Sequence, residues 1–273
     1  HICVIRGVGK GIYFIRIVSG QFSSSGRLMS LGQDDRCPEI KLENTSVLSY
    51  NSNDSKGGKT ERIMEYSEGE CLKFTGTTAD YSTVVTDVPG NSKTILFNFI
   101  ACTDVDGNNY PVVQIGTQVW MAENLKVTHY NDGTEIPDIT DESWSTLTTG
   151  AYAEYDNESA NVDIYGRLYN WHAVNSSSGL CPNGWHVPTD SEWKALEMHL
   201  GMTEEQANET GFRGTDEGGK LKEEGSEHWN SPNNGATNES GFTALPGGMK
   251  HINGDYSNIN VMGCFWSSHY IDV

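Results

Sequence analysis

Oxygen-bearing side chains alternate in the stretch DVDGN, the first place where the chain could bind a metal ion. Asp104, Asp106 and Asn108 lie around a glycine, and oxygens of this kind are the ligands that Ca²⁺ prefers. The glutamate that would complete an EF-hand loop is missing, because position 115 is Ile. An ordinary Asp/Asn/Gly turn explains the same residues. The turn is therefore the favoured interpretation, and Ca²⁺ is the alternative cofactor.

A second acidic loop, EYDNESANVDIYG, carries Asp156, Asn157, Glu158 and Asp163. A loop of this length needs something to hold it in place. A bound Ca²⁺ would do so, and so would turn-forming side chains. Calcium binding by Asp156, Asn157 and Asp163 and a plain loop are therefore nearly equal alternatives.

The stretch LCPNGWHVPTDSEW places Cys181 five residues before His186. Such a pair could act as nucleophile and base, but no neighbour is an obvious cause of a lowered thiol pKa. Cys181 is therefore interpreted as a structural disulfide cysteine, and His186 as a core-edge histidine that hydrogen-bonds loop backbone. The chain has no GxSxG, HExxH or Walker motif, so we expect no enzymatic activity.

Seven Trp and twelve Tyr residues could stack against sugars. The calcium–sugar signature of lectins, Glu-Pro-Asn followed by Trp-Asn-Asp, is absent. Most of the tryptophans stand beside apolar residues, which indicates core packing. Trp144 and Trp229 stand among polar residues, so we predict that they are exposed and name them as the candidate ligand-binding residues.

The composition narrows the range of partners. Acidic residues outnumber basic ones by 37 to 18, which gives a formal net charge of −19. Nucleic acid is an unsuitable partner, because phosphate binding requires clustered Lys and Arg. No apolar run is long enough to span a membrane. Six scattered cysteines fit either free thiols or one or two disulfides in an exported protein. His1 is not a natural start, so we expect a mature or incomplete part of a longer chain.

The first hundred residues have the pattern of short strands. Residues 11–31 are two β-rich runs around a polar turn, which predicts a hairpin. In the stretch TILFNF, Ile95 and Phe97 fall on one face and Leu96 on the other. We interpret residues 1–101 as one β-sandwich.

Residues 102–273 combine strands, loops and helices. Thr189 and Glu192 form a capping box before an apolar face at Trp193, Leu196 and Leu200. This pattern predicts a helix that Gly201 ends. A short second helix is expected in DEGGKLKEEGSEHW, and core strands are expected in GFTALPGG and CFWSSHY.

Six motifs occur in the order of one known family: TDVDGNNYPVVQIGTQVWMAENL, YGRLYNWHAV, GLCPNGWHVPTDSEW, GGKLKEE…HWN, NESGFTALPGG and FWSS. Together they resemble the Fibrobacter succinogenes major paralogous domain over about residues 102–273. The resemblance implies a C-type-lectin-like, formylglycine-generating-enzyme-like α+β fold in a secreted or cell-surface protein of Bacteroidota type. The preceding region resembles the Ig-like sandwich often found ahead of this domain. The fold expected is therefore an all-β Ig-like sandwich followed by a lectin-like α+β domain.

The resemblance also shows a departure near the end of the chain. Members of the family usually continue past WSS to a last strand with a cysteine, whereas this chain stops at Val273. The resemblance leaves Cys181 free or paired with Cys264, or has the missing strand supplied from elsewhere. An uncompleted sheet edge invites strand donation, so the first function expected is a structural or adhesive surface protein, with the subunit of a strand-exchanged filament as one form of it. Its partners would be further copies or surface glycans and proteins. A glycan-binding module, with or without Ca²⁺, is the second expectation. A formylglycine-generating-type enzyme is the third, and the copper-holding cysteine pair of those enzymes is not found.

Overall fold

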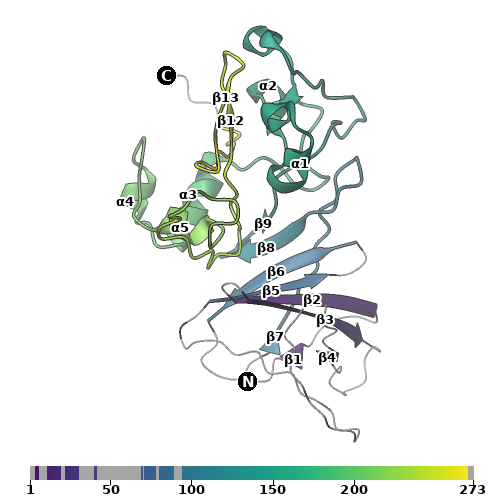
Figure 1. Ribbon diagram of the computed structural model, residues 1–273, viewed down its shortest axis with the longest axis vertical. Helices are drawn as coiled ribbons and strands as arrows, with labels where there is room; N and C mark the ends of the chain where they lie inside the picture. Colours follow the sequence, from purple (N-terminus) through teal and green to yellow (C-terminus); the bar gives the residue numbers. More distant parts are fainter. Residues whose placement is uncertain are drawn as a thin grey trace, which may run out of the picture. The chain divides into compact units, whose positions relative to one another are not determined.

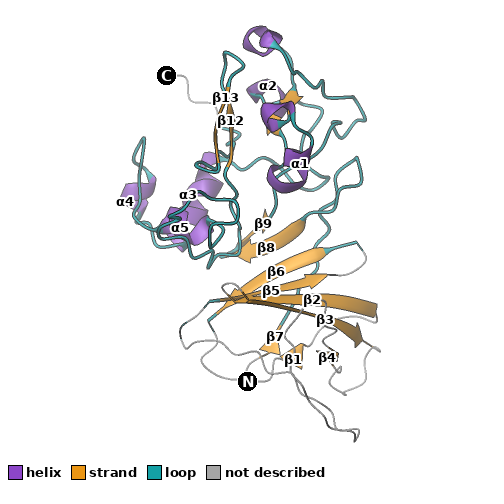
Figure 2. Cartoon of the chain, viewed as in Figure 1, coloured by secondary structure: helices purple, strands orange, loops and turns teal. Residues whose placement is uncertain are grey.

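The computed structural model describes residues 4–5, 11–19, 22–30, 40–41, 69, 71–77, 80–88 and 94–269. The chain divides into two compact units, His1–Ile100 and Ala101–Val273. Strands and a few short helices give a mostly-β fold (Figures 1 and 2). The boundary expected near residue 101 and this division are close, and each unit is described by itself below.

The first unit contains an antiparallel sheet. Its strands run in the order β4-β3-β2-β5-β6, with these bounds: β2 (Gly11–Ser19), β3 (Phe22–Ser30), β4 (Ile40–Lys41), β5 (Leu72–Thr77) and β6 (Ser82–Asp87). Strands β2 and β3 pair along their whole length, which confirms the predicted hairpin. Strand β1 (Val4–Ile5) pairs in parallel with β7 (Thr94–Ile95).

The core of the first unit follows from alternating side chains. Leu72 and Phe74 on β5 are buried, because successive side chains of a strand point to opposite faces. Ile95 and Phe97 are buried while Leu96 is exposed, so the predicted alternation is right. The strand itself ends at Ile95, and the residues that follow continue without ladder pairing.

The second unit opens with a hairpin of β8 (Pro111–Ile115) and β9 (Gln118–Met121), paired antiparallel. Two further antiparallel pairs are β10 (Tyr152–Ala153) with β11 (Leu168–Tyr169), and β12 (Gly247–Lys250) with β13 (Tyr256–Ile259). The helices are short: η1 (Glu142–Thr146), η2 (Tyr155–Asn157), α1 (Ala160–Tyr165), α2 (Trp171–Val174), α3 (Asp190–His199), α4 (Glu204–Ala207) and α5 (Glu217–Leu221).

Helix α3 begins as the sequence predicts. The Thr189 hydroxyl accepts from the Glu192 amide at 3.2 Å, and the Glu192 carboxylate accepts from the Thr189 amide at 2.8 Å. This reciprocal capping box satisfies two amides that a helix start leaves without partners. His186 contacts the same carboxylate at 2.9 Å. It is exposed and binds a side chain, so its prediction as a core-edge histidine bound to backbone is wrong.

The motifs that carry the family resemblance meet in one aromatic cluster. Trp120, Trp193, Phe242 and Phe265 come from four different motifs, and their ring centroids lie 4.9 to 6.2 Å apart where they touch. Such spacing is typical of packed aromatic side chains. Aromatic residues from four of the six motifs therefore pack together in the second unit, although Phe265 remains 41% exposed.

The two C-terminal motifs do not form the expected core strands. GFTALPGG forms no strand before Gly247, where β12 begins, and the φ angles of Gly241 and Thr243 are positive, at 72° and 60°. Cys264, Phe265 and Trp266 of CFWSSHY belong to no strand and are exposed. The backbone here bonds mainly to groups outside any ladder: the Trp193 indole donates to the Trp266 carbonyl at 3.1 Å, and the Ser268 amide donates to Pro188 at 2.8 Å. The residue Tyr270 lies outside the described residues.

Candidate binding surface

The DVDGN stretch is a hydrogen-bonded turn around a buried carboxylate. Oδ1 of Asp104 accepts from the amides of Asp106 at 3.0 Å and Asn108 at 2.9 Å. Oδ2 accepts from the Asn108 side-chain amide at 2.9 Å and from the Tyr110 hydroxyl at 2.6 Å. Four donors thus point at the oxygens that Ca²⁺ would need. The geometry supports the Asp/Asn/Gly turn and not the calcium site, because a cation and a set of donors cannot share the same lone pairs.

The second carboxylate of the turn ties it to a neighbouring loop. Asp106 accepts from the amide and the hydroxyl of Thr128, the latter at 2.8 Å, and contacts His129 Nδ1 at 2.6 Å. Burial opposes ionisation of Asp106, but these hydrogen bonds outweigh it and lower the pKa of its carboxyl. The Tyr110 hydroxyl, which donates to Asp104, also accepts from the Lys126 amide at 2.9 Å. Both aspartates therefore serve to fasten residues 104–110 to residues 126–129.

The second acidic loop does not gather its carboxylates. Asp156 and Asp163 are exposed, and neither belongs to a group of three or more metal-ligating side chains among the described residues. Asn157 accepts from the Tyr256 hydroxyl at 2.7 Å and donates to the Thr140 carbonyl at 3.3 Å. Side-chain hydrogen bonds thus hold this loop, which is the plain-loop alternative.

Trp144 is buried, which corrects the prediction that it is exposed. The ammonium group of Lys250 lies 4.9 Å from the centroid of its ring and 4.4 Å from that of Tyr256. The same Nζ donates to the Ile139 carbonyl at 3.0 Å and to the Tyr256 hydroxyl at 2.8 Å. The face of Trp144 that could have stacked on a sugar is thus covered by a cation from strand β12.

Trp229 is also buried, so the same prediction is wrong there. Its indole donates to the Ala244 carbonyl at 3.1 Å, and Lys222 Nζ lies 4.2 Å from its ring centroid. Burial lowers the pKa of Lys222. Both candidate tryptophans stand in polar stretches of sequence, yet each is covered by a lysine. A cation over the face of an indole ring is a favourable contact.

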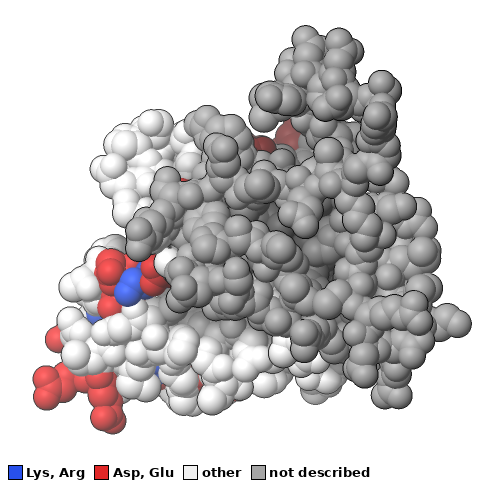
Figure 3. Space-filling model, turned by 90° about the horizontal axis from the view of Figure 1, so that it is seen from below, with Lys and Arg blue, Asp and Glu red and all other residues white. Residues whose placement is uncertain are grey.

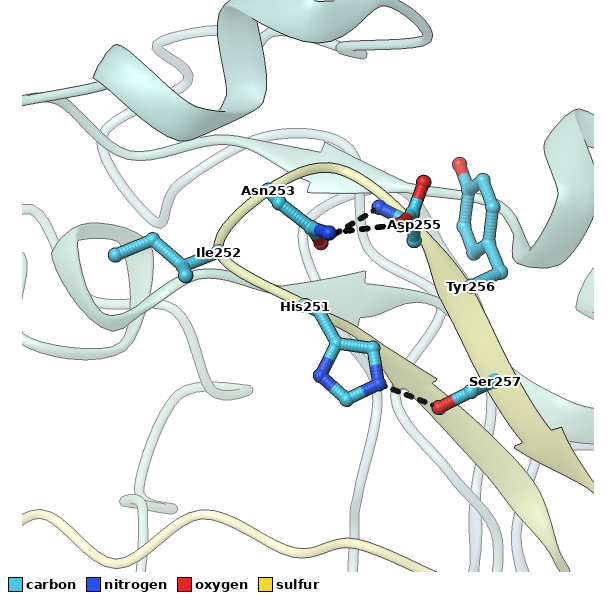
Figure 4. A pocket seen from close by; sticks show the side chains of 6 residues that line it. All are labelled: His251, Ile252, Asn253, Asp255, Tyr256 and Ser257. Carbon is cyan, nitrogen blue, oxygen red and sulfur yellow. Dashed lines mark hydrogen bonds between the residues drawn. The ribbon is translucent and has the colours of Figure 1, made fainter.

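The tip of the β12–β13 hairpin forms a surface hollow of about 570 Å³. His251, Asn253, Asp255 and Tyr256 line it together with Ile252 and Ser257 (Figure 4). His251 Nε2 lies 2.6 Å from the Ser257 hydroxyl, and Asn253 donates to Asp255 at 2.7 Å. The hollow is open to solvent and offers polar groups beside one aromatic ring, so its lining is more polar than that of most small-molecule pockets.

Apolar side chains are exposed just beyond β13. In the segment Val261–Trp266, called the apolar tract below, Val261 is 55% exposed, Met262 37%, Phe265 41% and Trp266 44%. Trp266 donates its indole hydrogen to the Tyr169 carbonyl at 2.9 Å and packs 6.0 Å from Trp171. The tract is therefore held in place on the second unit while its apolar atoms face solvent.

The cysteines do not form the candidate disulfide. Cys181 and Cys264 are both free thiols, the first half-buried and the second exposed. Burial raises the pKa of Cys181 to about 11 and also raises that of Cys264. A raised pKa leaves the thiol protonated at neutral pH, which is unsuited to a nucleophile.

Acidic side chains dominate the charged surface where it is described. On the face shown in Figure 3, red side chains prevail over blue ones, in line with the net charge of −19.

One set of metal-ligating groups, Glu223, Glu227 and His228, comes together in the described part of the chain. The sequence signal for this group is the spacing of Glu and His in the stretch KEEGSEH, from which no metal site was predicted.

The protein is mostly β, and aromatic residues from four of its motifs pack together in the second unit. The Fibrobacter succinogenes major domain matches the chain over residues 113–272. Because this match covers more than half of the 273 residues, the chain belongs to that family. The match begins at Val113, so the DVDGN turn lies outside it. No curated protein and no solved structure matches the chain.

None of the helices in the described residues combines the length and the apolar character that a membrane span requires.

Proposed function

We propose that the chain is an extracellular cell-surface protein with a structural or adhesive role. Membership of the family suggests a cell-surface protein of unspecified function. The proposal includes the finer architecture that the resemblance implies, an Ig-like sandwich in residues 1–101 and a lectin-like α+β domain in residues 102–273. Its natural location would be outside the cell.

The observation that carries this proposal is the apolar tract. Four of its six side chains are large, apolar and at least 37% exposed. Contiguous apolar surface on a soluble domain marks a place of protein contact, and Trp, Phe and Met are enriched at the centres of such contacts. The tract therefore fits association with another protein surface better than it fits catalysis.

The partner that we propose is a second copy of the chain, which donates a strand. Residues 264–269 belong to no strand among the described residues, apart from the single bridge between Gly248 and Gly263 just before them. A segment of this kind can accept main-chain hydrogen bonds from an added strand. If each copy gives a strand to the next, the contact is head-to-tail and builds a filament.

The test compares two exposed valines by sedimentation and negative-stain microscopy of the full chain. Val261→Asp places a charge in the apolar tract, so it should abolish the self-association that we expect of the wild type at high concentration. Val105→Asp is the matched control, because Val105 is 46% exposed but lies in the DVDGN turn. Wild-type protein that stays monomeric at all concentrations, or equal behaviour of the two variants, would overturn the proposal of self-assembly.

The second candidate function is glycan binding, and the hollow at the β12–β13 hairpin favours it. Asp255 and Asn253 offer hydrogen-bonding groups there beside the ring of Tyr256 (Figure 4). Binding to a glycan array that Asp255→Asn abolishes, with Asp132→Asn as the exposed control, is the result that would favour this function. Binding that both variants retain would remove the hollow from consideration.

We propose no enzymatic activity. A formylglycine-generating-type reaction would need a reactive cysteine pair, whereas burial raises the pKa of Cys102 to about 12 and that of Cys181 to about 11. Burial thus keeps both thiols protonated at neutral pH, which weakens them as nucleophiles.

A further inference from the structure

A loop between α5 and the segment before β12 brings three metal-ligating side chains together. One ligand atom from each of Glu223, Glu227 and His228 lies within 4.8 Å of the others. His228 Nδ1 is 2.9 Å from both carboxylate oxygens of Glu223. The side chains of this pair are only 21% and 17% exposed, while Glu227 is at the surface. Two partly buried groups are therefore fixed, and the third can close over them.

The loop is held firmly at both ends of the group. The Glu223 amide and the Trp229 indole both donate to the carbonyl of Ala244, each at 3.1 Å. The Asn233 side chain donates to the carbonyls of Glu223 at 2.8 Å and Gly225 at 2.7 Å. Because these contacts fix the backbone on either side, the ligand atoms require little ordering when an ion binds.

The surroundings restrict the orientation of the imidazole. The ring of Tyr165 on α1 meets the ring of His228 edge-on, with centroids 5.9 Å apart. Lys222, the cation beside this loop in the sequence, lies over the face of Trp229. The same loop also contains a buried oxygen, Asn233 Oδ1, that has no hydrogen-bond partner within the described residues.

We propose that Glu223, Glu227 and His228 bind a divalent transition-metal ion, with zinc as the best match. Two carboxylates supply negative charge for a dication, and an imidazole nitrogen favours zinc over calcium or magnesium, which prefer oxygen ligands alone. Three protein ligands leave a fourth position of the tetrahedron open to water or to a group from another molecule. The site would also fasten the loop that covers Trp229. This inference does not depend on the proposed function.

Calorimetric titration of the full, untagged chain with Zn²⁺ tests the proposal. The wild type should bind one ion at this site, and Glu227→Gln should weaken that binding by about tenfold or more, since loss of groups that merely support metal ligands already costs about that much. Glu227 is exposed, so its variant should remain folded. Glu224→Gln, a neighbouring exposed glutamate outside the group, is the matched control and should bind like the wild type.

Two further measurements sharpen the outcome. His228→Gln should weaken Zn²⁺ binding as Glu227→Gln does, because an amide cannot replace the imidazole nitrogen. Ca²⁺ should give no comparable heat. Zn²⁺ binding that survives both substitutions, an equal loss in Glu224→Gln, or the absence of wild-type binding would each overturn the proposal. Circular dichroism of every variant shows that loss of binding is not loss of fold.

Discussion

Replacing Asp104 by Asn is expected to destabilise the second unit by about 3 kcal/mol, because hydrogen bonds to a charged group contribute about 1.5–3 kcal/mol each. Asp104 is 6% exposed and accepts four hydrogen bonds. An Asn side chain has the same shape but presents an NH₂ group in place of one oxygen. Two of the four donors, the Asn108 side-chain amide and the buried Tyr110 hydroxyl, would then face another donor.

The damage should spread beyond the turn itself. The Tyr110 hydroxyl donates to Asp104 and accepts from the Lys126 amide, so it joins the turn to the loop after β9. Burial and the bond to Asp104 raise the pKa of Tyr110, which keeps its proton in place as the donor. With Asn at position 104, this chain of hydrogen bonds loses its acceptor. We therefore expect the unfolding midpoint of the second unit to fall in thermal and urea denaturation.

Asp132→Asn is the control, because Asp132 is exposed and accepts from the Thr134 amide within its own loop. Its midpoint should stay near that of the wild type. The same experiment decides between the turn and the calcium site. Exchange of a chelator for millimolar Ca²⁺ should leave the wild-type midpoint unchanged, whereas a clear rise with Ca²⁺ that Asp104→Asn removes would contradict the turn.

Local signals explain what the sequence could predict. The start of α3 depends on Thr189 and Glu192, which are three residues apart, and its buried face on Leu196 and Leu200. The β2–β3 hairpin likewise depends on neighbouring runs. Interactions of this range are visible in a single stretch of sequence, because helix and hairpin geometry fix which residues meet.

The burial of Trp144 and the exposure of Phe265 and Trp266 were not predicted, because they depend on contacts between residues far apart in the sequence. Trp144 stands in the polar stretch DESWST, yet Lys250 covers it from a strand that lies far along the chain. Phe265 and Trp266 stand in an apolar motif and were expected in the core, but nothing in the described residues covers one side of them. Burial is a property of the assembled fold, so composition around one residue predicted the wrong surface in both cases.

Lys250→Met is expected to lower the stability of the second unit by about 2 kcal/mol, the sum of modest hydrogen-bond and cation–π contributions. Lys250 Nζ donates to the Ile139 carbonyl and to the Tyr256 hydroxyl. It also lies over the rings of Trp144 and Tyr256. Methionine keeps the apolar stem and its packing, so the loss reports the ammonium group alone.

The physical cause is that one ammonium group connects the β12–β13 hairpin to two other segments. Ile139 precedes η1, which carries Trp144, and Tyr256 also donates to Asn157 of η2 at 2.7 Å. Burial lowers the pKa of Lys250, while the carboxylates of Asp138 and Asp141 oppose that change. The ammonium group is therefore partly removed from water, and the acidic neighbours favour its charged form. Cation–π contacts are most favourable for such partly desolvated cations.

A double-mutant cycle with Trp144→Leu separates the contact between Lys250 and the Trp144 ring from the other contacts of this lysine. Thermal denaturation of the two single variants and the double variant should give a coupling of about 1 kcal/mol. Lys194→Met is the control, because Lys194 forms an ordinary i,i+4 ion pair with Asp190 on α3 and should change stability by less than about 0.5 kcal/mol. Additive effects of Lys250→Met and Trp144→Leu would show that the lysine stabilises the hairpin through its hydrogen bonds and its contact with the Tyr256 ring. A Lys250→Met variant as stable as Lys194→Met would mean that this lysine does not hold the hairpin against η1 and η2.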